Sequence, residues 1–302
     1  MNRMLLLIRR EFWEHRAFLI APAVVAATCI VVLTFASGEL WFRNIPLDAL
    51  IEEQFRGRTT PIVGLILIGF GSFFFFVSMV VGFFYLLDCL HSDRKDRSIL
   101  FWKSMPLSDT ATTLSKLTTA AVALPVVALG AAIVGNILFA IVYTTRLGFD
   151  TTTNLWPVVF DGAAWIGALT LLAWGAIAAV LWYLPIMGWL LLVSSWAKRA
   201  VMLWAVLPFI MAIILESLFR STYVASTLWY RIVGWLDPAY RDLSAITSFI
   251  EVHGEKVPWP SSALELLSAA EYFSNVDLWI GIAVAAAFVW GAILIRRHRT
   301  DI

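Results

Sequence analysis

Charged residues are scarce in this chain, and their scarcity argues against a water-soluble protein. Of 302 residues only 14% are charged while 61% are hydrophobic, and the mean hydropathy is +0.83. Soluble domains average about 25% charged and about 45–50% apolar residues. The 15 Trp and 21 Phe suit lipid and its interfaces. The composition therefore predicts an integral membrane protein.

Cysteine and histidine are too few to indicate a disulfide framework or a metal site. Cys29 lies in an apolar run and Cys89 at the edge of another. The histidines are scattered without ligand spacing: His15, His91, His253 and His298. We therefore expect no metal and no cofactor in this chain.

Catalytic motifs are also lacking. A phosphate-binding loop needs Gly-Lys-Ser/Thr, and none of the five lysines follows a glycine. Neither His-Glu-x-x-His nor Gly-x-Ser-x-Gly occurs. We expect no enzyme, so that energy for any work must come from a partner or an ion gradient.

Long apolar runs use most of the chain, which we treat as one transmembrane domain over residues 1–302. A membrane-spanning helix needs about 20 mostly apolar residues. Six stretches qualify: Phe18–Ala36, Ile62–Leu87, Leu117–Tyr143, Gly162–Trp196, Ala200–Phe219 and Leu278–Ile295. The fold prediction is an all-α integral membrane protein with six transmembrane helices.

The fourth stretch is long enough to raise the alternative of two spans, with Pro185 as its breaker. With six spans and cytoplasmic termini, 14 of the 22 Lys and Arg residues lie inside. Splitting the stretch would move Lys198, Arg199 and the Arg296–Arg299 cluster outside. The positive-inside rule therefore favours one long helix.

Three segments outside these spans carry recognisable patterns. Residues 1–16 place Leu5, Ile8 and Phe12 at helical spacing, which predicts an amphipathic interfacial helix; the alternative is a basic start that only sets topology. Residues 220–277 predict short extracytoplasmic helices, either a structural cap or a gate or partner-binding surface. Residues 88–116 predict helix, breaker and helix, with Ser108 or Asp109 capping the second; these residues form either a docking surface or a solvated loop.

Polar groups within the spans are rare. Asn136 is the most central of them. It is a possible pathway residue, although one interhelical hydrogen bond is the commoner role for such a side chain. The scarcity of intramembrane charge counts against a proton or sodium relay.

The arrangement resembles the membrane (permease) subunit of a type II ABC exporter, the ABC type 2 permease family. One feature is Arg9-Arg10-Glu11-Phe12-Trp13-Glu14 followed by Pro22, similar to the family's interfacial elbow helix. Another is the loop with Asp93-Arg94-Lys95-Asp96-Arg97-Ser98-Ile99-Leu100, then Ser104-Met105-Pro106-Leu107-Ser108 and Lys116. The last is the six-span layout with a sizeable loop before the final span. A departure is Arg97, where family members often have Gly.

The resemblance implies that the 88–116 loop is a cytoplasmic coupling helix seated in a cleft of a separate ATPase. The ATPase-coupling residues it implies are Asp93, Arg94, Asp96, Arg97, Ile99, Phe101, Trp102, Lys103 and Pro106. The implied partners are two ABC ATPase subunits that bind ATP and Mg, a second permease chain (identical or different) and membrane lipid, with no nucleic acid. The implied location is the bacterial inner (plasma) membrane, with both termini cytoplasmic.

The function implied is export of an amphipathic, peptide or lipid-like substrate along a pathway between two permease chains. The first alternative is a protein that moves no substrate and transmits ATPase strokes to a periplasmic partner or helps an envelope enzyme mature. An ion-coupled secondary transporter is a second alternative, disfavoured by the uncharged spans.

Overall fold

The computed structural model describes residues 3–35, 59–96, 108–148, 156–220, 222–240 and 266–298. These residues are helical apart from turns, short connections and one isolated antiparallel bridge between Tyr240 and Leu267. The long helices are α2 (Ala17–Phe35), α4 (Thr59–Lys95), α7 (Leu124–Gly148), α9 (Gly162–Trp196), α10 (Val201–Leu218) and α15 (Val276–His298). The shorter ones are α1 (Arg3–Glu14), α6 (Asp109–Thr118), the π-helical turn η2 (Thr119–Ala123), α8 (Trp156–Val159), α11 (Tyr223–Val233), α12 (Leu236–Ala239) and α14 (Ala269–Ser274).

The all-α class predicted from the composition is confirmed. Five helical stretches among the described residues are long and apolar enough to cross a membrane. A sixth is obtained if the pair Met4–Glu14 and Ala17–Val32, bent by 55°, counts as one span. The chain is therefore a multi-pass membrane protein by the length and composition of its helices.

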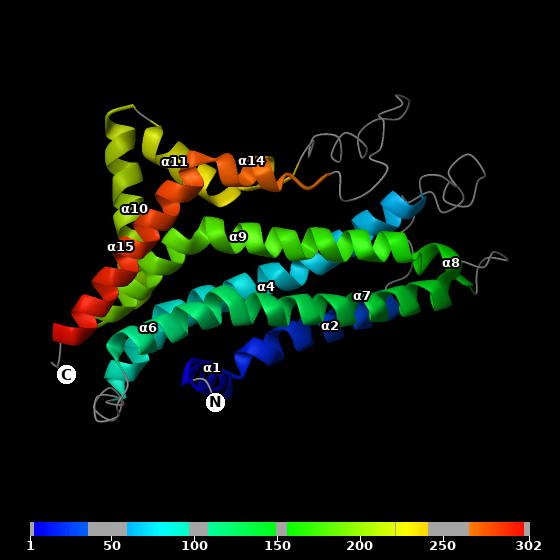
Figure 1. Cartoon of the computed structure of the whole chain (residues 1–302), viewed down its shortest axis with the longest axis horizontal. Helices are drawn as coiled ribbons and strands as arrows, with labels where there is room; N and C mark the ends of the chain where they lie inside the picture. Colours follow the sequence, from blue (N-terminus) through cyan, green and yellow to red (C-terminus); the bar gives the residue numbers. More distant parts are fainter. Residues whose placement is uncertain are drawn as a thin grey trace.

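The doubtful fourth stretch forms one helix. α9 runs unbroken from Gly162 to Trp196 with Pro185 inside it, as the charge count predicted. Figure 1 shows α9 curving along its length rather than turning back on itself. At its end a short connection leads into α10 through Ala200, whose φ of 50° is left-handed, so that α10 runs back from the same end of the molecule.

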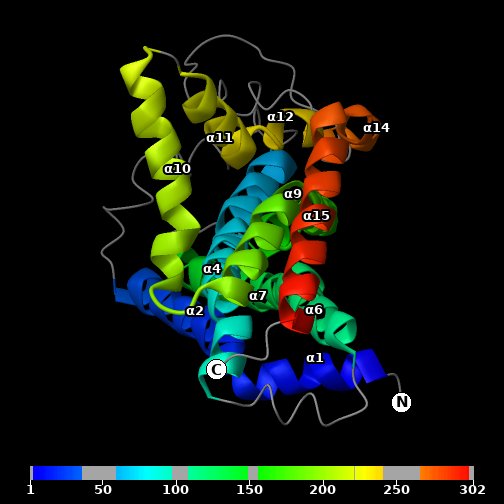
Figure 2. The ribbon, with the colours of Figure 1, turned by 90° about the vertical axis from the view of Figure 1, so that its left-hand side faces the viewer.

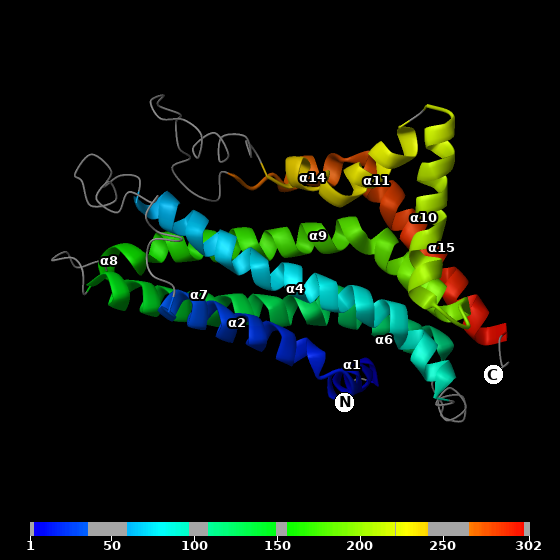
Figure 3. The same ribbon diagram turned by 180° about the vertical axis from the view of Figure 1, so that it is seen from behind.

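The helices form a bundle with one diverging arm. α2, α4, α7 and α9 run side by side and α15 packs against the last part of α9, while α10 starts at that same end and leans away from the other helices (Figures 1 and 3). α1 lies across the same end of the bundle, below the ends of α4, α6 and α15 (Figure 2). The short helices α11 and α12 lie between the far ends of α10 and α15, and α14 lies beside the far end of α15, on the side away from α10 (Figure 2).

The outer surfaces of the bundle are strongly apolar. Only 11% of the α10 span is buried within the chain. Its exposed large side chains are Met202, Leu203, Trp204, Phe209, Ile210, Met211, Ile213, Ile214, Leu215 and Leu218. Soluble monomers seldom expose a contiguous apolar face of this kind, so this surface fits a hydrocarbon environment.

Candidate functional site

The two ends of the predicted coupling segment are anchored in the bundle. α4 ends at Lys95 and α6 begins at Asp109, so these helices hold the chain on either side of residues 97–107. Ser108 is the N-cap of α6, and its hydroxyl accepts a hydrogen bond from the Ala111 amide at 3.1 Å. The predicted second helix of the loop, with Ser108 as its cap, is thus confirmed.

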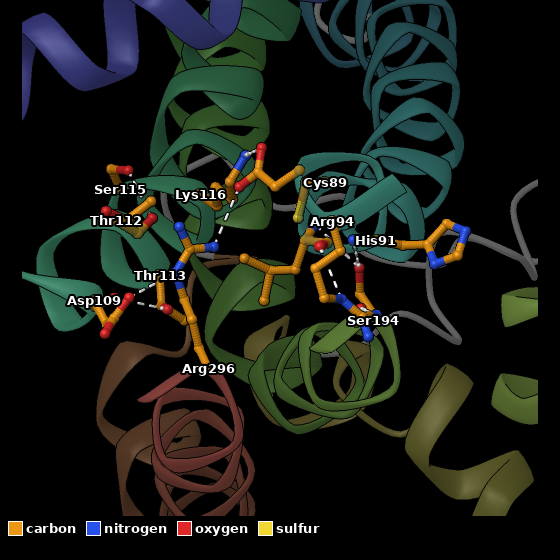
Figure 4. Close-up of polar contacts among 12 residues, drawn as sticks. Cys89, His91, Arg94, Asp109, Thr112, Thr113, Ser115, Lys116, Ser194 and Arg296 are labelled. Atoms are coloured by element: carbon orange, nitrogen blue, oxygen red, sulfur yellow. Dashed lines mark hydrogen bonds and ion pairs between the residues drawn. The ribbon is translucent and has the colours of Figure 1, made fainter. Parts of the chain in front are cut away.

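Lys116, in the last turn of α6, is the centre of a buried charge cluster. Only 1% of its side chain is exposed. Its ammonium group lies 3.2 Å from Glu11 Oε1 on α1 and 3.6 Å from Asp93 Oδ1 on α4. One cation therefore joins three helices that are far apart in the sequence (Figure 4).

Arg296 extends the cluster to the C-terminal helix. Its Nη1 lies 3.2 Å from Asp93 Oδ2 and its Nε lies 3.0 Å from Asp109 Oδ1. Asp109 is the first residue of α6, so α15 is tied to the last turns of α4 and to the first turn of α6 (Figure 4). The final span thereby contacts both ends of the coupling segment.

Glu11 is held from several directions. Besides Lys116, its carboxylate accepts a hydrogen bond from the Tyr85 hydroxyl at 2.9 Å and pairs with Arg10 Nη2 at 2.9 Å. Burying a charge is costly unless other charges and hydrogen bonds compensate it. The ring of partners meets that condition and fixes α1 against α4 and α6.

A second group of contacts joins α4 to the end of α9. Arg94 Nη2 donates to the carbonyls of Ser194 at 2.6 Å and Ala197 at 2.9 Å, and the His91 ring donates to the same Ala197 carbonyl at 3.2 Å. The amides of Leu90 and His91 each donate to the Ser194 hydroxyl at 3.1 Å. A cation at the last carbonyls of a helix also complements the helix dipole.

We name these contacts the charged end: Glu11, Asp93, Asp109, Lys116 and Arg296, together with His91, Arg94 and Ser194. The group connects α1, α4, α6, α15 and the α9–α10 turn where α4 ends and α6 begins. Displacement of either end of the segment must therefore be transmitted to these helices or break buried ion pairs.

Three of the predicted coupling residues lie within the described residues. Asp93 and Arg94 are engaged inside the chain, in the contacts given above, whereas Asp96 is exposed at the end of α4. The others lie outside the described residues: Arg97, Ile99, Phe101, Trp102, Lys103 and Pro106. The structure thus pairs Asp93 with Lys116 of α6 and Arg296 of α15, and it bonds Arg94 to the end of α9.

Asn136 lies at the contact of α7 with α4. It is 1% exposed, and its Nδ2 donates to the Leu67 carbonyl at 3.2 Å. The amide is close to Gly71, where a Cβ would meet Nδ2 at 3.2 Å. This is the interhelical hydrogen bond that sequence reasoning named as the commoner role.

At the other side of the bundle, the predicted short helices before the last span are present as α11, α12 and α14. They are joined to α9 by aromatic side chains that hydrogen-bond to backbone carbonyls, for example Trp182 to Arg231 at 3.0 Å and Tyr272 to Ala178 at 2.6 Å. We call this group the aromatic cap: Trp174, Trp182, Tyr183, Trp235, Tyr240 and Tyr272. In the sequence, Ser262 followed by Glu265 predicts a capping box, but both residues lie outside the described residues.

Arg231 completes the aromatic cap. Its guanidinium lies 4.8 Å from the centroid of the Trp182 ring, and Nη1 donates to the Asp277 carbonyl at 3.2 Å. Burial raises the pKa of the Tyr272 phenol to about 12, an effect that Arg231 partly opposes. The pKa of Tyr240 is likewise raised by burial, so both phenols stay protonated and able to donate near neutral pH.

The sequence did not predict that α1 and α15 meet the end of α4 and the start of α6 in one cluster. The available signal was charge at span edges on one side of the membrane: Glu11, Asp93, Asp109, Lys116 and Arg296 all lie in segments placed inside by the Lys/Arg count. Which acid pairs with which base depends on helix packing, and the sequence does not encode it locally. Near this cluster, Glu11, Glu14 and His15 place ligand atoms within 4.8 Å of one another, and Glu11 is also paired with the Lys116 ammonium at 3.2 Å. Comparison with known proteins finds no family model, no curated protein and no solved structure that matches this chain.

Proposed function

We propose that the chain is the permease subunit of an ATP-binding-cassette exporter, driven by separate ATPase subunits. The observation that carries the proposal is the charged end. A segment of the predicted coupling type leaves the bundle where one buried cluster ties together α1, α4, α6, α15 and, through Arg94, the α9–α10 turn. A loop that only joined two spans would need no such connections.

The proposed mechanism follows from this connectivity. ATP binding by two partner ATPases, with Mg, closes them and moves residues 97–107. Because both ends of that segment are fixed to the charged end, the movement passes to the spans as near-rigid bodies. The pathway opens between this chain and a second permease chain, and an amphipathic or lipid-like cargo leaves outward or laterally.

The coupling residues then divide into two roles. Asp96, Arg97 and Lys103 supply charged contacts to the ATPase. Three apolar side chains fill its cleft, namely Ile99, Phe101 and Trp102. Pro106 ends the coupling helix. Asp93 and Arg94 act as positioning residues, since their charges are engaged by Lys116, Arg296 and the end of α9.

The topology that goes with this proposal places the charged end in the cytoplasm of a bacterial cell, next to the inner membrane. Both termini then lie on the ATPase side, and the aromatic cap faces outward. The Lys/Arg distribution supports this orientation.

The test is co-purification with the ATPase encoded beside this gene. We expect Phe101→Glu/Trp102→Glu to abolish stoichiometric ATPase binding, because two carboxylates cannot fill an apolar cleft. The matched control is Lys198→Glu/Arg199→Glu, which adds two acids at the exposed α9–α10 turn on the same side.

Retention of the ATPase by the control and its loss from the loop variant, with both permeases monodisperse, would support the proposal. If the wild-type chain binds no ATPase, the exporter proposal is wrong. If the control loses the ATPase as completely as the loop variant, the docking surface is not the 97–107 segment.

A further inference from the structure

α1 has two distinct faces. Its inner face packs on α6 and η2 and carries Leu7 and Glu11, which are 7% and 1% exposed. Its outer face carries Leu5 and Trp13, which are 61% and 72% exposed, together with Leu6. The outer face is thus an apolar and aromatic surface left uncovered by the described part of the chain.

The outer face is also basic. Arg9 is exposed, and its guanidinium carbon lies 6.0 Å from the centroid of the Trp13 ring. Arg16, at the bend into α2, is exposed as well. Neither arginine forms an ion pair with another described residue, whereas the one exposed acid nearby, Glu14, pairs with Arg10 at 3.0 Å.

The apolar part of this face continues onto the first span. Leu19 and Ile20, in the first turn of α2, are 58% and 55% exposed. α1 meets α2 at 55° and lies across the end of the bundle (Figure 2). A surface that begins on the span and bends onto a basic amphipathic helix lies at the boundary between acyl chains and headgroups.

We propose that Arg9 and Arg16, with Trp13, bind the phosphate headgroup of an anionic phospholipid, whose acyl chains rest on Leu5, Leu6 and the start of α2. Charge complementarity selects an anionic over a zwitterionic lipid. Trp13 supplies the aromatic contact typical of the interface. A lipid fits better than a protein partner because the apolar face is continuous with that of a span.

This lipid site has a consequence for the charged end. Glu11 projects from the opposite face of the same helix to Lys116. Binding of an anionic lipid therefore holds α1 in the position at which the buried ion pair forms. The site itself does not depend on the proposed exporter function, because it is a property of this chain alone.

The test is a lipid titration of the full chain in detergent, followed by native mass spectrometry, with phosphatidylglycerol and phosphatidylcholine in parallel. Each basic residue near an anionic surface strengthens binding about fivefold. We expect Arg9→Gln/Arg16→Gln to raise the apparent Kd for phosphatidylglycerol about 25-fold. The control Lys198→Gln/Arg199→Gln removes the same charge from exposed positions at the same end of the molecule. It should change the apparent Kd for phosphatidylglycerol by less than threefold.

Trp13→Ala is expected to weaken the binding of phosphatidylglycerol and of phosphatidylcholine to a similar extent, because it removes an aromatic contact and no charge. If the arginine variant loses affinity for phosphatidylglycerol and not for phosphatidylcholine, the proposal is supported. Equal losses in the arginine variant and the control would overturn it, since binding would then reflect total charge. Unchanged phosphatidylglycerol binding in the arginine variant would overturn it as well.

Discussion

The charged end and the aromatic cap fix different sets of helices, and they do so by different means. At the charged end, Lys116 and Arg296 join carboxylates that come from α1, α4 and α6. In the aromatic cap, Trp and Tyr side chains donate neutral hydrogen bonds to backbone carbonyls, as Tyr240 does to Leu171 at 3.0 Å. Each side of α9 is therefore fixed, but by interactions of different kinds.

The difference bears on which part can change its arrangement. A carboxylate or ammonium in the charged end has alternative partners within reach, so pairs can exchange while every charge stays compensated. A bulky ring seated against a helix has one position in which its hydroxyl or indole meets the carbonyl. We therefore expect the aromatic cap to move with α9 as one body, and the charged end to keep its helices joined while individual ion pairs exchange partners.

Removing one charge from the charged end should have the largest effect. Lys116→Met leaves Glu11 and Asp93 buried without their shared cation, at a cost of about 3–5 kcal/mol. The measurement is the free energy of unfolding in detergent. Lys198→Met, an exposed lysine, is the control and should stay within about 0.5 kcal/mol of wild type.

The double variant Glu11→Gln/Lys116→Met sharpens this test. Because both members of the pair are neutral, it should be more stable than Lys116→Met alone. If the two single effects simply add in the double variant, the Glu11–Lys116 pair is not coupled, and the description of the charged end is wrong.

An intermediate effect is expected from crowding the aromatic cap. A Cβ at Gly175 on α9 would collide with the Tyr240 hydroxyl, so Gly175→Ala should displace the ring and break its bond to Leu171. Overpacking of this kind costs about 1–3 kcal/mol. The matched control is Gly69→Ala on α4, where a Cβ meets nothing within 4 Å and only the gain in helix propensity remains.

Thermal unfolding of the two glycine variants measures the difference. Equal stability of Gly175→Ala and Gly69→Ala would show that the Tyr240 contact is not rigid. The aromatic cap would then be as adaptable as the charged end.

The smallest effect is expected at Asn136, which belongs to neither region. Asn136→Ala removes one interhelical hydrogen bond, which in membrane proteins is worth about 0.6 kcal/mol on average. Stability should fall by about 0.6 kcal/mol, and on the proposed exporter function transport in vesicles should be unchanged. Ser72→Ala, which removes a hydroxyl bonded only within its own helix, is the control. Loss of transport without loss of stability would instead make Asn136 a pathway residue.

Much of the fold follows from local properties of the sequence. Apolar runs of sufficient length predict spans, and α9 has the bounds expected for the fourth stretch. The third span was expected over Leu117–Tyr143, whereas the continuous helix begins at Asp109. The difference arises because Lys116 is buried and Asp109 partly buried by pairing with other helices, whereas hydropathy counts both as polar.

The candidate site was less predictable. The pattern of Asp93 and Arg94 within a charge cluster favoured exposed contacts to a partner. Their burial results from Arg296, about 200 residues away, and from the last carbonyls of α9. No local signal reports such pairings, because charges at the ends of separate helices look alike until the helices are packed.

The sequence by itself determined the membrane class, the approximate limits of the long apolar helices, a helix cap at Ser108 or Asp109 and the amphipathic character of α1. These depend on hydropathy, length and nearest neighbours along the chain. Only the tertiary structure decided that Glu11, Asp93, Asp109, Lys116 and Arg296 form one cluster, and that the aromatic cap is seated on α9. Such contacts bring together residues that are distant along the chain, and helix packing selects them through the free energy of burying charge and aromatic surface.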